Sequence, residues 1–106
     1  MVSQFDVFWV DLNPTIGAEM QKTRPCVVVS PQELNNHLDT VIIIPITSAI
    51  HAYPYRVRCR IMGRDGEIAT DQIRTIDKRR LKKHITTISE GEITLLQDIL
   101  RQMFCE

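Results

Sequence analysis

Two apolar runs dominate the pattern of hydrophobic and polar positions along this chain. They cover residues 22–30 and 40–48, are rich in β-branched side chains, and each carries a proline near one end. Short uninterrupted runs of this kind favour strands buried on both faces over an amphipathic helix. The connector at residues 31–39 is short and contains Asn35–Asn36, so we expect a hairpin-like return that makes the two strands antiparallel neighbours.

The neighbouring patterns predict further strands. Residues 5–12 indicate a mostly buried first strand, and residues 13–23 an exposed, mobile loop that follows it. In residues 55–61 apolar and basic residues alternate, as in a strand with one buried face. The inward positions are Tyr55, Val57, Cys59 and Ile61, and the outward positions are Arg56, Arg58 and Arg60.

The last third of the chain predicts a turn, more short strands and a helix. A turn is expected at residues 64–66, then two short strands or one bent strand over residues 67–76, and a last strand over residues 83–88. Ser89 and Glu92 have the spacing of a capping box, which starts a helix. Its apolar stripe consists of Ile93, Leu96, Leu100 and Met103, widened by Leu95, Ile99 and Phe104. Together these elements predict a mainly β (β plus α) fold, a small and strongly curved β-barrel with a C-terminal α-helix.

Length and composition limit the class of protein. With 106 residues we expect one domain over residues 1–106, large enough to bury about two-thirds of the surface of its unfolded chain. The three cysteines, Cys26, Cys59 and Cys105, are far apart, so neither a disulfide framework nor a zinc site is indicated. There is no apolar stretch of about 18 residues and no signal-peptide pattern, which predicts a cytoplasmic protein with no membrane partner.

The net charge of zero conceals an uneven distribution. Residues 1–54 carry two Lys and Arg against five Asp and Glu, residues 55–83 carry ten against four, and residues 84–106 carry one against four. A basic block in an otherwise acidic chain is typical of a polyanion site. The three arginines of residues 55–61 fit an anionic partner, although a solvated face gives the same pattern. The basic run at residues 77–83 is more often a solvated turn than a site.

The central pair of strands brings polar groups together. In an antiparallel register Arg24 lies beside Ile46 and Thr47, and Pro25 keeps Arg24 extended. A fixed arginine suits a phosphate or the charge that develops in phosphoryl transfer, because its planar donors grip two oxygens and it stays charged. Thr47 and Ser48 are too weakly acidic to be bases unaided, so we assign them to hydrogen bonding of a phosphate. An ordinary salt bridge of Arg24 at the barrel edge is the alternative.

The other polar residues favour chemistry without a metal or another cofactor. Asp65 and Asp71 are isolated, whereas a two-metal nuclease needs several convergent carboxylates. His37, His51 and His84 belong to different loops or strand ends, which disfavours a pair of catalytic histidines. RNA needs neither group, because its own 2′-hydroxyl is positioned to attack the adjacent phosphate.

Five segments resemble the MazF/PemK family of type II toxins in their order and spacing. They are residues 10–19, Lys22–Pro25, Pro45–Ser48, Tyr53–Pro54 and residues 71–77. The resemblance covers nearly the whole chain. It implies an SH3-like barrel, a homodimer, and a metal-independent endoribonuclease that cuts single-stranded RNA, usually mRNA, and leaves a 2′,3′-cyclic phosphate and a 5′-hydroxyl. It also implies a cognate antitoxin protein whose tail occupies the RNA groove.

The resemblance also implies roles for single residues. Arg24 matches the family's catalytic arginine, an acid and charge stabiliser, and Thr47 matches its catalytic threonine. The loop after the first strand matches a mobile gate. The expected RNA-binding residues, taken from the resemblance and from the arginine-bearing strand, are Glu19, Ser48, Arg56, Arg58, Asp71 and Gln72.

Two positions depart from the family pattern. Some members carry a histidine and an arginine proposed as catalytic where this chain has Ala18 and Ala69. A mechanism that relies on those two groups does not apply here, so Arg24 and Thr47 carry the expected chemistry. Asp71 is open to two roles, as a base or as a structural residue that orders the turn before Gln72.

Two rival functions are left open. The CcdB family is similar in fold but inhibits DNA gyrase by protein contact, and its members typically end in Trp-Gly-Ile, whereas this chain ends in Met-Phe-Cys-Glu. A barrel that only binds RNA through Arg56, Arg58 and Arg60 is the other, and it predicts salt-sensitive binding without cleavage.

Overall fold

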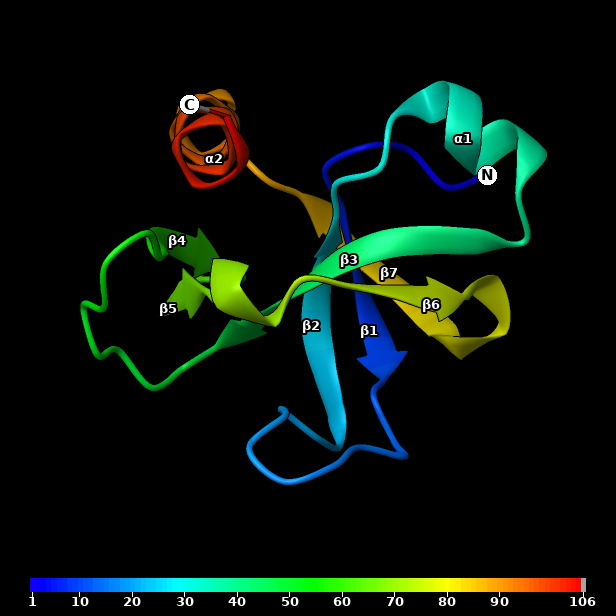
Figure 1. The fold of residues 1–106 in the computed structure, drawn as a ribbon, viewed down its shortest axis with the longest axis horizontal. Helices are drawn as coiled ribbons and strands as arrows, with labels where there is room; N and C mark the ends of the chain where they lie inside the picture. The colour runs from blue at the N-terminus through cyan, green and yellow to red at the C-terminus, as the bar shows by residue number, and fades with distance from the viewer. Residues whose placement is uncertain (106) are drawn as a thin grey trace.

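The computed structural model describes residues 1–105 and shows a strongly curled antiparallel sheet with one long helix at its C-terminal end (Figure 1). Glu106, the last residue of the expected domain, lies outside the described residues. In chain order the elements are β1 (Asp6–Asp11), β2 (Thr23–Val28), α1 (Gln32–His37), β3 (Thr40–Thr47), β4 (Val57–Ile61), β5 (Arg64–Ile68), η1 (Thr70–Gln72), β6 (Arg74–Asp77), η2 (Lys78–Arg80), β7 (Leu81–Thr87) and α2 (Glu90–Phe104). This architecture confirms the predicted mainly β fold with a C-terminal helix.

The sheet is arranged around β3. The strand order is β4-β5-β3-β2-β1-β7, and β6 pairs with β3 off this path. One edge of β3 pairs with β2, while the other edge is divided, because residues 40–43 pair with β6 and residues 46–47 with β5. The change of partner falls at Ile44–Pro45, and Pro45 has no N–H to donate to a ladder. The chain between β5 and β6, which contains η1, crosses this point and donates from Ala69 N to the Pro45 carbonyl (2.9 Å).

The predicted central pair is confirmed with the expected register. β2 and β3 are antiparallel, with Cys26 opposite Pro45 and Val28 opposite Ile43. Continuing this register by two residues places Arg24 opposite Thr47. Side chains directly opposite each other in an antiparallel pair lie on the same face of the sheet. The fold therefore brings the two groups together as the sequence predicts.

Both faces of the central strands are buried, also as predicted. Val7, Val27 and Ile44 belong to a cluster on one face, which β4, β5 and α2 complete through residues such as Val57, Ile68 and Leu96. Phe8, Cys26 and Ile43 belong to the cluster on the other face, which β6 completes through Ile76. Because successive residues of a strand point to opposite faces, an uninterrupted apolar run supplies both clusters.

The connector between β2 and β3 differs from the expected hairpin-like return, because residues 32–37 form the short helix α1. Asn35, expected in a turn, is buried and anchors this helix. The side-chain amide of Asn35 donates to the Ser30 backbone carbonyl (2.9 Å), and the backbone carbonyl of Asn35 accepts from Lys78 Nζ. One of these contacts comes from Lys78, which is distant in sequence, so the local pattern of residues 31–39 did not reveal the helix.

The segment after β4 also differs from its prediction. Residues 64–66, expected as a turn, lie in β5, and the turn falls instead at Met62–Gly63, where both residues have positive φ angles of 52° and 77°. The strands expected over residues 67–76 are the end of β5, the single turn η1 and β6. Tyr55, expected inward on β4, precedes that strand and is exposed.

The C-terminal helix begins as predicted. Ser89 Oγ accepts from Glu92 N (3.1 Å) and Glu92 Oε1 accepts from Ser89 N (2.8 Å), which is a complete capping box. The second carboxylate oxygen of Glu92 accepts from Arg60 N (2.7 Å) and so ties the helix to β4. The apolar stripe is narrower than expected, since Leu95 and Phe104 are 55% and 65% exposed. In residues 1–105 no helix has both the length and the apolar character to cross a membrane.

Candidate functional site

A cleft of about 680 Å³ lies where the N-terminal end of β2 meets the C-terminal end of β3. We call it the Arg24 cleft. Its lining includes Trp9, Arg24, Ile46, Thr47, Ser48 and Met62. Three residues predicted for catalysis or RNA binding, Arg24, Thr47 and Ser48, therefore share one hollow. The apolar residues Trp9 and Met62, which the sequence did not single out for a site, are 38% and 75% exposed.

The guanidinium of Arg24 is free to bind an anion. Arg24 is half-buried, and its Nε donates to the Gln21 carbonyl (3.1 Å). Of the ion pairs formed among residues 1–105, none involves Arg24. The expected alternative, an ordinary salt bridge at the barrel edge, is therefore not what the structure shows. One hydrogen bond orients the side chain while its two terminal nitrogens stay available for the paired oxygens of a phosphate.

Thr47 is held beside this cation with its hydroxyl positioned as a donor. The residue is 6% exposed, and its Oγ1 accepts from Ala49 N (3.1 Å). A hydroxyl that accepts from a backbone N–H still has its own hydrogen to donate, for example to a phosphate oxygen. The backbone of Thr47 pairs with Glu67 of β5. Gly66 allows this close pairing, because a Cβ atom there would lie 2.7 Å from the Thr47 carbonyl oxygen.

Gly66→Ala is therefore expected to destabilise the protein by about 1–3 kcal/mol, the usual cost of forcing an extra carbon into a tightly packed site. The obstacle is a backbone oxygen, which cannot rotate away as a flexible side chain can. Urea unfolding measures the effect, with Gly91→Ala in α2 as the matched control. A Cβ atom at Gly91 would meet only Ser89 Oγ at 4.0 Å. Equal stability of the two variants would contradict the close approach at Thr47.

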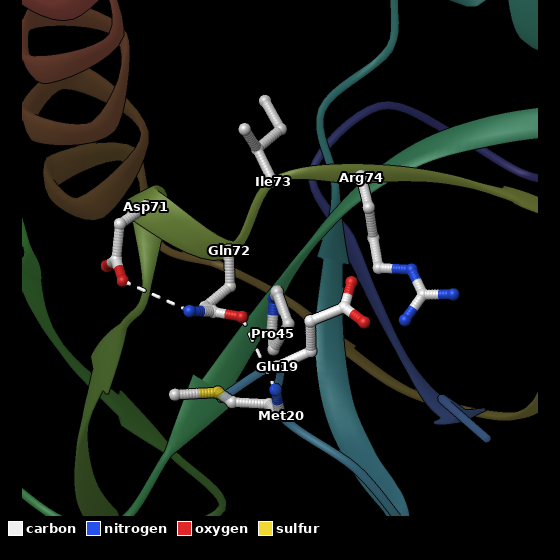
Figure 2. Close-up of a pocket in the computed structure, with 7 residues that line it drawn as sticks. All are labelled: Glu19, Met20, Pro45, Asp71, Gln72, Ile73 and Arg74. Atoms are coloured by element: carbon white, nitrogen blue, oxygen red, sulfur yellow. Dashed lines mark hydrogen bonds between the residues drawn. The ribbon is translucent and has the colours of Figure 1, made fainter. Parts of the chain in front are cut away.

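A second, smaller hollow of about 230 Å³ lies where β3 changes partner, and we call it the Gln72 pocket (Figure 2). Its lining consists of Glu19, Met20, Pro45, Asp71, Gln72, Ile73 and Arg74. Gln72 links its two sides, because its amide nitrogen donates to Asp71 Oδ2 (3.3 Å) and its amide oxygen accepts from Met20 N (3.3 Å). The predicted RNA-binding residues Glu19, Asp71 and Gln72 thus gather here and not in the Arg24 cleft. Arg74, which sequence reasoning did not single out, joins them.

The geometry of the Gln72 pocket explains why it is polar. Figure 2 shows carboxylate, amide and guanidinium groups from two segments, residues 19–20 and residues 71–74, around Pro45. The gap left by the missing N–H of Pro45 is crossed by η1, and this crossing places Asp71 and Gln72 over β3. Arg74 donates from NH1 to the Leu12 carbonyl (3.3 Å) and so is oriented by the end of β1. Fixed donors and acceptors of this kind suit hydrogen bonding to the edge of a base.

Arg56 lies in a partly buried ion-pair network with Glu67 and the half-exposed Asp71, which corrects its predicted place on an outward face. Its side chain is only 8% exposed. It donates from Nε and NH2 to the two oxygens of Asp71 (2.8 and 3.1 Å) and from NH1 to Glu67 (3.4 Å). Strand alternation failed here because β4 begins at Val57, one residue later than the arginine. Arg56 therefore supports the Gln72 pocket from behind and offers no free cation.

Glu67 is the residue of this network that the sequence analysis missed. Its side chain is 1% exposed. Burial alone would raise the pKa of Glu67, but the backbone N–H groups of Ala52 and His51 and the Arg56 guanidinium lower that pKa below its ordinary value. The hydrogen bond from Arg56 is the main cause of a lowered pKa at Asp71 as well. Both carboxylates therefore stay ionised at neutral pH and keep their hydrogen bonds.

The other basic residues divide into exposed and structural ones. Arg58 is exposed on β4 and lines neither hollow, so the structure does not group it with the other predicted RNA-binding residues. Arg60 pairs with Asp65 at 3.0 Å in an exposed position. In the basic run at residues 77–83, two side chains hydrogen-bond to backbone carbonyls elsewhere in the chain. Arg80 donates to the carbonyls of Asp11 and Asn13, and Lys78 donates to the carbonyl of Asn35. Some of the basic side chains that make the charge distribution uneven therefore bind other parts of the same chain.

Comparisons with known proteins agree with this fold. Residues 3–104 match the family model described as the PemK-like, MazF-like toxin of type II toxin-antitoxin system. The chain is 32% identical over 106 residues to the protein named Endoribonuclease MazF from Staphylococcus epidermidis, covering 94% of this chain and 88% of that protein. These matches do not support the CcdB-like alternative.

Solved structures show the same fold at lower sequence identity. MazF from Deinococcus radiodurans superposes with a TM-score of 0.87 at 22% identity, covering 99% of this chain and 97% of that one. A mycobacterial endoribonuclease in complex with its cognate antitoxin gives a TM-score of 0.81 at 18% identity, with coverages of 96% and 93%. A model match over nearly the whole length and a relative above 30% identity lead to one conclusion. The chain belongs to the family of PemK-like, MazF-like toxins of type II toxin–antitoxin systems.

Proposed function

We propose that this chain, an endoribonuclease toxin of a type II toxin–antitoxin system, cuts single-stranded RNA in the Arg24 cleft without a metal ion. One observation carries the proposal: an arginine with no ion-pair partner among residues 1–105 lines the same cleft as the Thr47 and Ser48 hydroxyls. An uncompensated cation beside hydroxyl donors suits a phosphodiester, whose charge increases in the transition state. Residues 1–106 act as one toxin domain.

The reaction follows from what these groups do best. The 2′-hydroxyl of the RNA attacks the adjacent phosphorus and releases its proton to water, the bond from phosphorus to the 5′-oxygen breaks, and the 5′-oxygen takes up a proton from water. The products are a 2′,3′-cyclic phosphate and a 5′-hydroxyl. Arg24 stabilises the extra negative charge with two donors and hydrogen-bonds the departing oxygen. Thr47 donates to a phosphate oxygen and Ser48 stands beside it. The nucleophile belongs to the RNA, so the protein needs to orient and stabilise rather than supply an attacking group.

The Gln72 pocket is assigned to recognition of a base. Glu19 supplies a carboxylate acceptor and Gln72 an amide, and both lie within one hollow of about 230 Å³. Sequence-specific readers of RNA bind unpaired bases through contacts to their edges. A small pocket with fixed polar groups favours one base over others, and this gives the cutting its sequence preference.

The proposed partners are an antitoxin protein and a second copy of the chain. A structural relative was solved with its cognate antitoxin, which supports an antitoxin here. Exposed Trp9 and Met62 in the Arg24 cleft supply apolar surface for protein contact, which supports the expected homodimer. The free thiols of Cys26, Cys59 and Cys105 fit a reducing, cytoplasmic compartment, where the mRNA substrate is.

Incubation of the purified protein with a mixed RNA pool in EDTA tests the proposal. We expect discrete, sequence-specific cuts whose new ends carry a 2′,3′-cyclic phosphate and a 5′-hydroxyl, detected by end mapping and by their response to end-modifying enzymes. Cutting that appears only when a divalent metal is restored would overturn the proposed chemistry. Salt-sensitive RNA binding without new ends would favour the binding-only barrel instead.

A further inference from the structure

The loop between β3 and β4 carries a stacked pair of aromatic rings that the assignments above do not use. The rings of His51 and Tyr53 lie 4.8 Å apart, centroid to centroid, with an angle of 13° between their planes. Both side chains are exposed, Tyr53 to 53%. Aromatic rings that only pack in the hydrophobic core are usually buried. This pair is instead partly open to solvent, with Tyr53 placed between His51 and the Arg56 guanidinium and the two rings in a fixed relative orientation.

The loop is held in place by the buried network described above. Glu67 Oε2 accepts from Ala52 N (2.6 Å), the residue between the two rings. The guanidinium carbon of Arg56 lies 4.8 Å from the centroid of the Tyr53 ring, and the same guanidinium contacts Glu67. The two rings are thus oriented before any ligand arrives. Binding to a preorganised surface loses little conformational freedom.

The loop begins at the Arg24 cleft, although neither ring is part of the lining of that cleft or of the Gln72 pocket. His51 follows Ser48 of the Arg24 cleft by three residues, so their Cα atoms are at most about 11 Å apart. On its other side the loop ends at Arg56, which binds Asp71 of the Gln72 pocket. The ring pair therefore belongs to a segment that begins at Ser48 of the Arg24 cleft and ends at Arg56, whose side chain binds Asp71 of the Gln72 pocket.

We propose that His51 and Tyr53 form a platform on which one unpaired base of the RNA stacks, next to the phosphate that is cut. This inference rests on the proposed function, because it identifies a further contact of the same substrate. Every base has a π face, so stacking adds affinity and aligns the strand without reading its sequence. The platform also explains a preference for single strands, since a paired base has no free face to offer at such a site.

Binding of short oligonucleotides that span one mapped cut tests the platform. Cutting is blocked by a 2′-deoxy sugar at the attacking nucleotide, and a set of such strands carries one abasic position each. For the wild-type protein we expect one abasic position near the cut to weaken binding by about 5- to 100-fold, the range measured for loss of one stacked base. Tyr53→Ala and His51→Ala are expected to weaken binding of the intact strand by a similar factor and to remove the penalty at that one position.

The controls separate stacking from other effects. Tyr53→Phe keeps the ring and is expected to bind like the wild type. Tyr55→Ala removes a similarly exposed ring from the same loop that has no aromatic partner among residues 1–105, and it is expected to retain the abasic penalty. Tyr53→Ala binding as tightly as Tyr55→Ala, or an unchanged penalty at every abasic position, would overturn the platform. A docking role for the rings toward a protein partner would give that same unchanged penalty. Cutting of the all-ribose strand by the wild-type protein is scored separately, so failure of the platform is distinguishable from failure of the proposed nuclease.

Discussion

Arg24→Ala is expected to cut a mapped RNA site about 10²- to 10³-fold more slowly than the wild type, the scale for removing one preorganised group that stabilises developing charge. The guanidinium is oriented by the Gln21 carbonyl and has no ion-pair partner among residues 1–105. Its removal therefore leaves no buried partner unpaired, and the loss falls on the reaction. Single-turnover rates at saturating protein measure it. Arg24→Lys keeps the charge but loses the two-pronged grip, so an intermediate rate is expected.

Arg101→Ala serves as the matched control for this experiment. Arg101 is an exposed arginine of α2, its contact with Asp98 is a loose 4.0 Å, and it lines neither the Arg24 cleft nor the Gln72 pocket. The control removes the same charge and is expected to cut like the wild type. If Arg24→Ala also cuts at the wild-type rate, Arg24 has no part in the mechanism.

Arg56→Ala is expected to lower the free energy of unfolding by about 3–5 kcal/mol, because removing one partner of a buried pair leaves the other charge unpaired. The side chains of Arg56 and Glu67 are 8% and 1% exposed. Glu67 would keep its ionised carboxylate with only the backbone N–H donors of its loop. Urea unfolding measures the change, with every variant at the same protein concentration, because the proposed dimer would make stability depend on concentration.

The same protein supplies a control pair close by. Arg60 binds Asp65 at 3.0 Å, but their side chains are 67% and 54% exposed. Exposed pairs contribute little, so Arg60→Ala is expected to cost less than about 1 kcal/mol. Glu67→Gln, which keeps the shape of the side chain, is expected to be milder than Glu67→Ala. Equal stabilities of Arg56→Ala and Arg60→Ala would show that the Arg56 network is not buried in solution.

The parts of the fold that were predicted from sequence depend on short-range patterns. The paired strands β2 and β3 consist of continuous apolar runs, and burial on both faces is the only arrangement that removes so many β-branched side chains from water. The start of α2 depends on two residues three positions apart, Ser89 and Glu92, which cap each other. The prediction that Arg24 lies beside Thr47 followed from the antiparallel register of β2 and β3.

The predictions that failed concern groups whose environment is supplied by distant residues. The helix α1 depends on buried Asn35, which binds Ser30 and Lys78. Arg56 was expected to face solvent because the predicted strand began at Tyr55, two residues before β4 begins. Its true partners, Glu67 and Asp71, follow it by 11 and 15 positions. A periodic pattern predicts which face of a strand or helix a residue lies on. It does not predict which residues of a later segment pack against that face.

The sequence by itself determined most of the strands, the terminal helix, the pairing that sets Arg24 against Thr47, and the family. Only the tertiary structure decided that Ser48 lines one hollow while Glu19, Asp71 and Gln72 line another. It also decided that Arg56 supports the Gln72 pocket from behind, and that Glu67 anchors the loop with the stacked rings. The physical reason is the change of partner along β3. Where Pro45 cannot donate to a ladder, β5 and β6 separate and η1 crosses the gap. The resulting Gln72 pocket is formed by three chain segments, at residues 19–20, Pro45 and residues 71–74. No single segment has a hydrophobic periodicity that would predict this pocket.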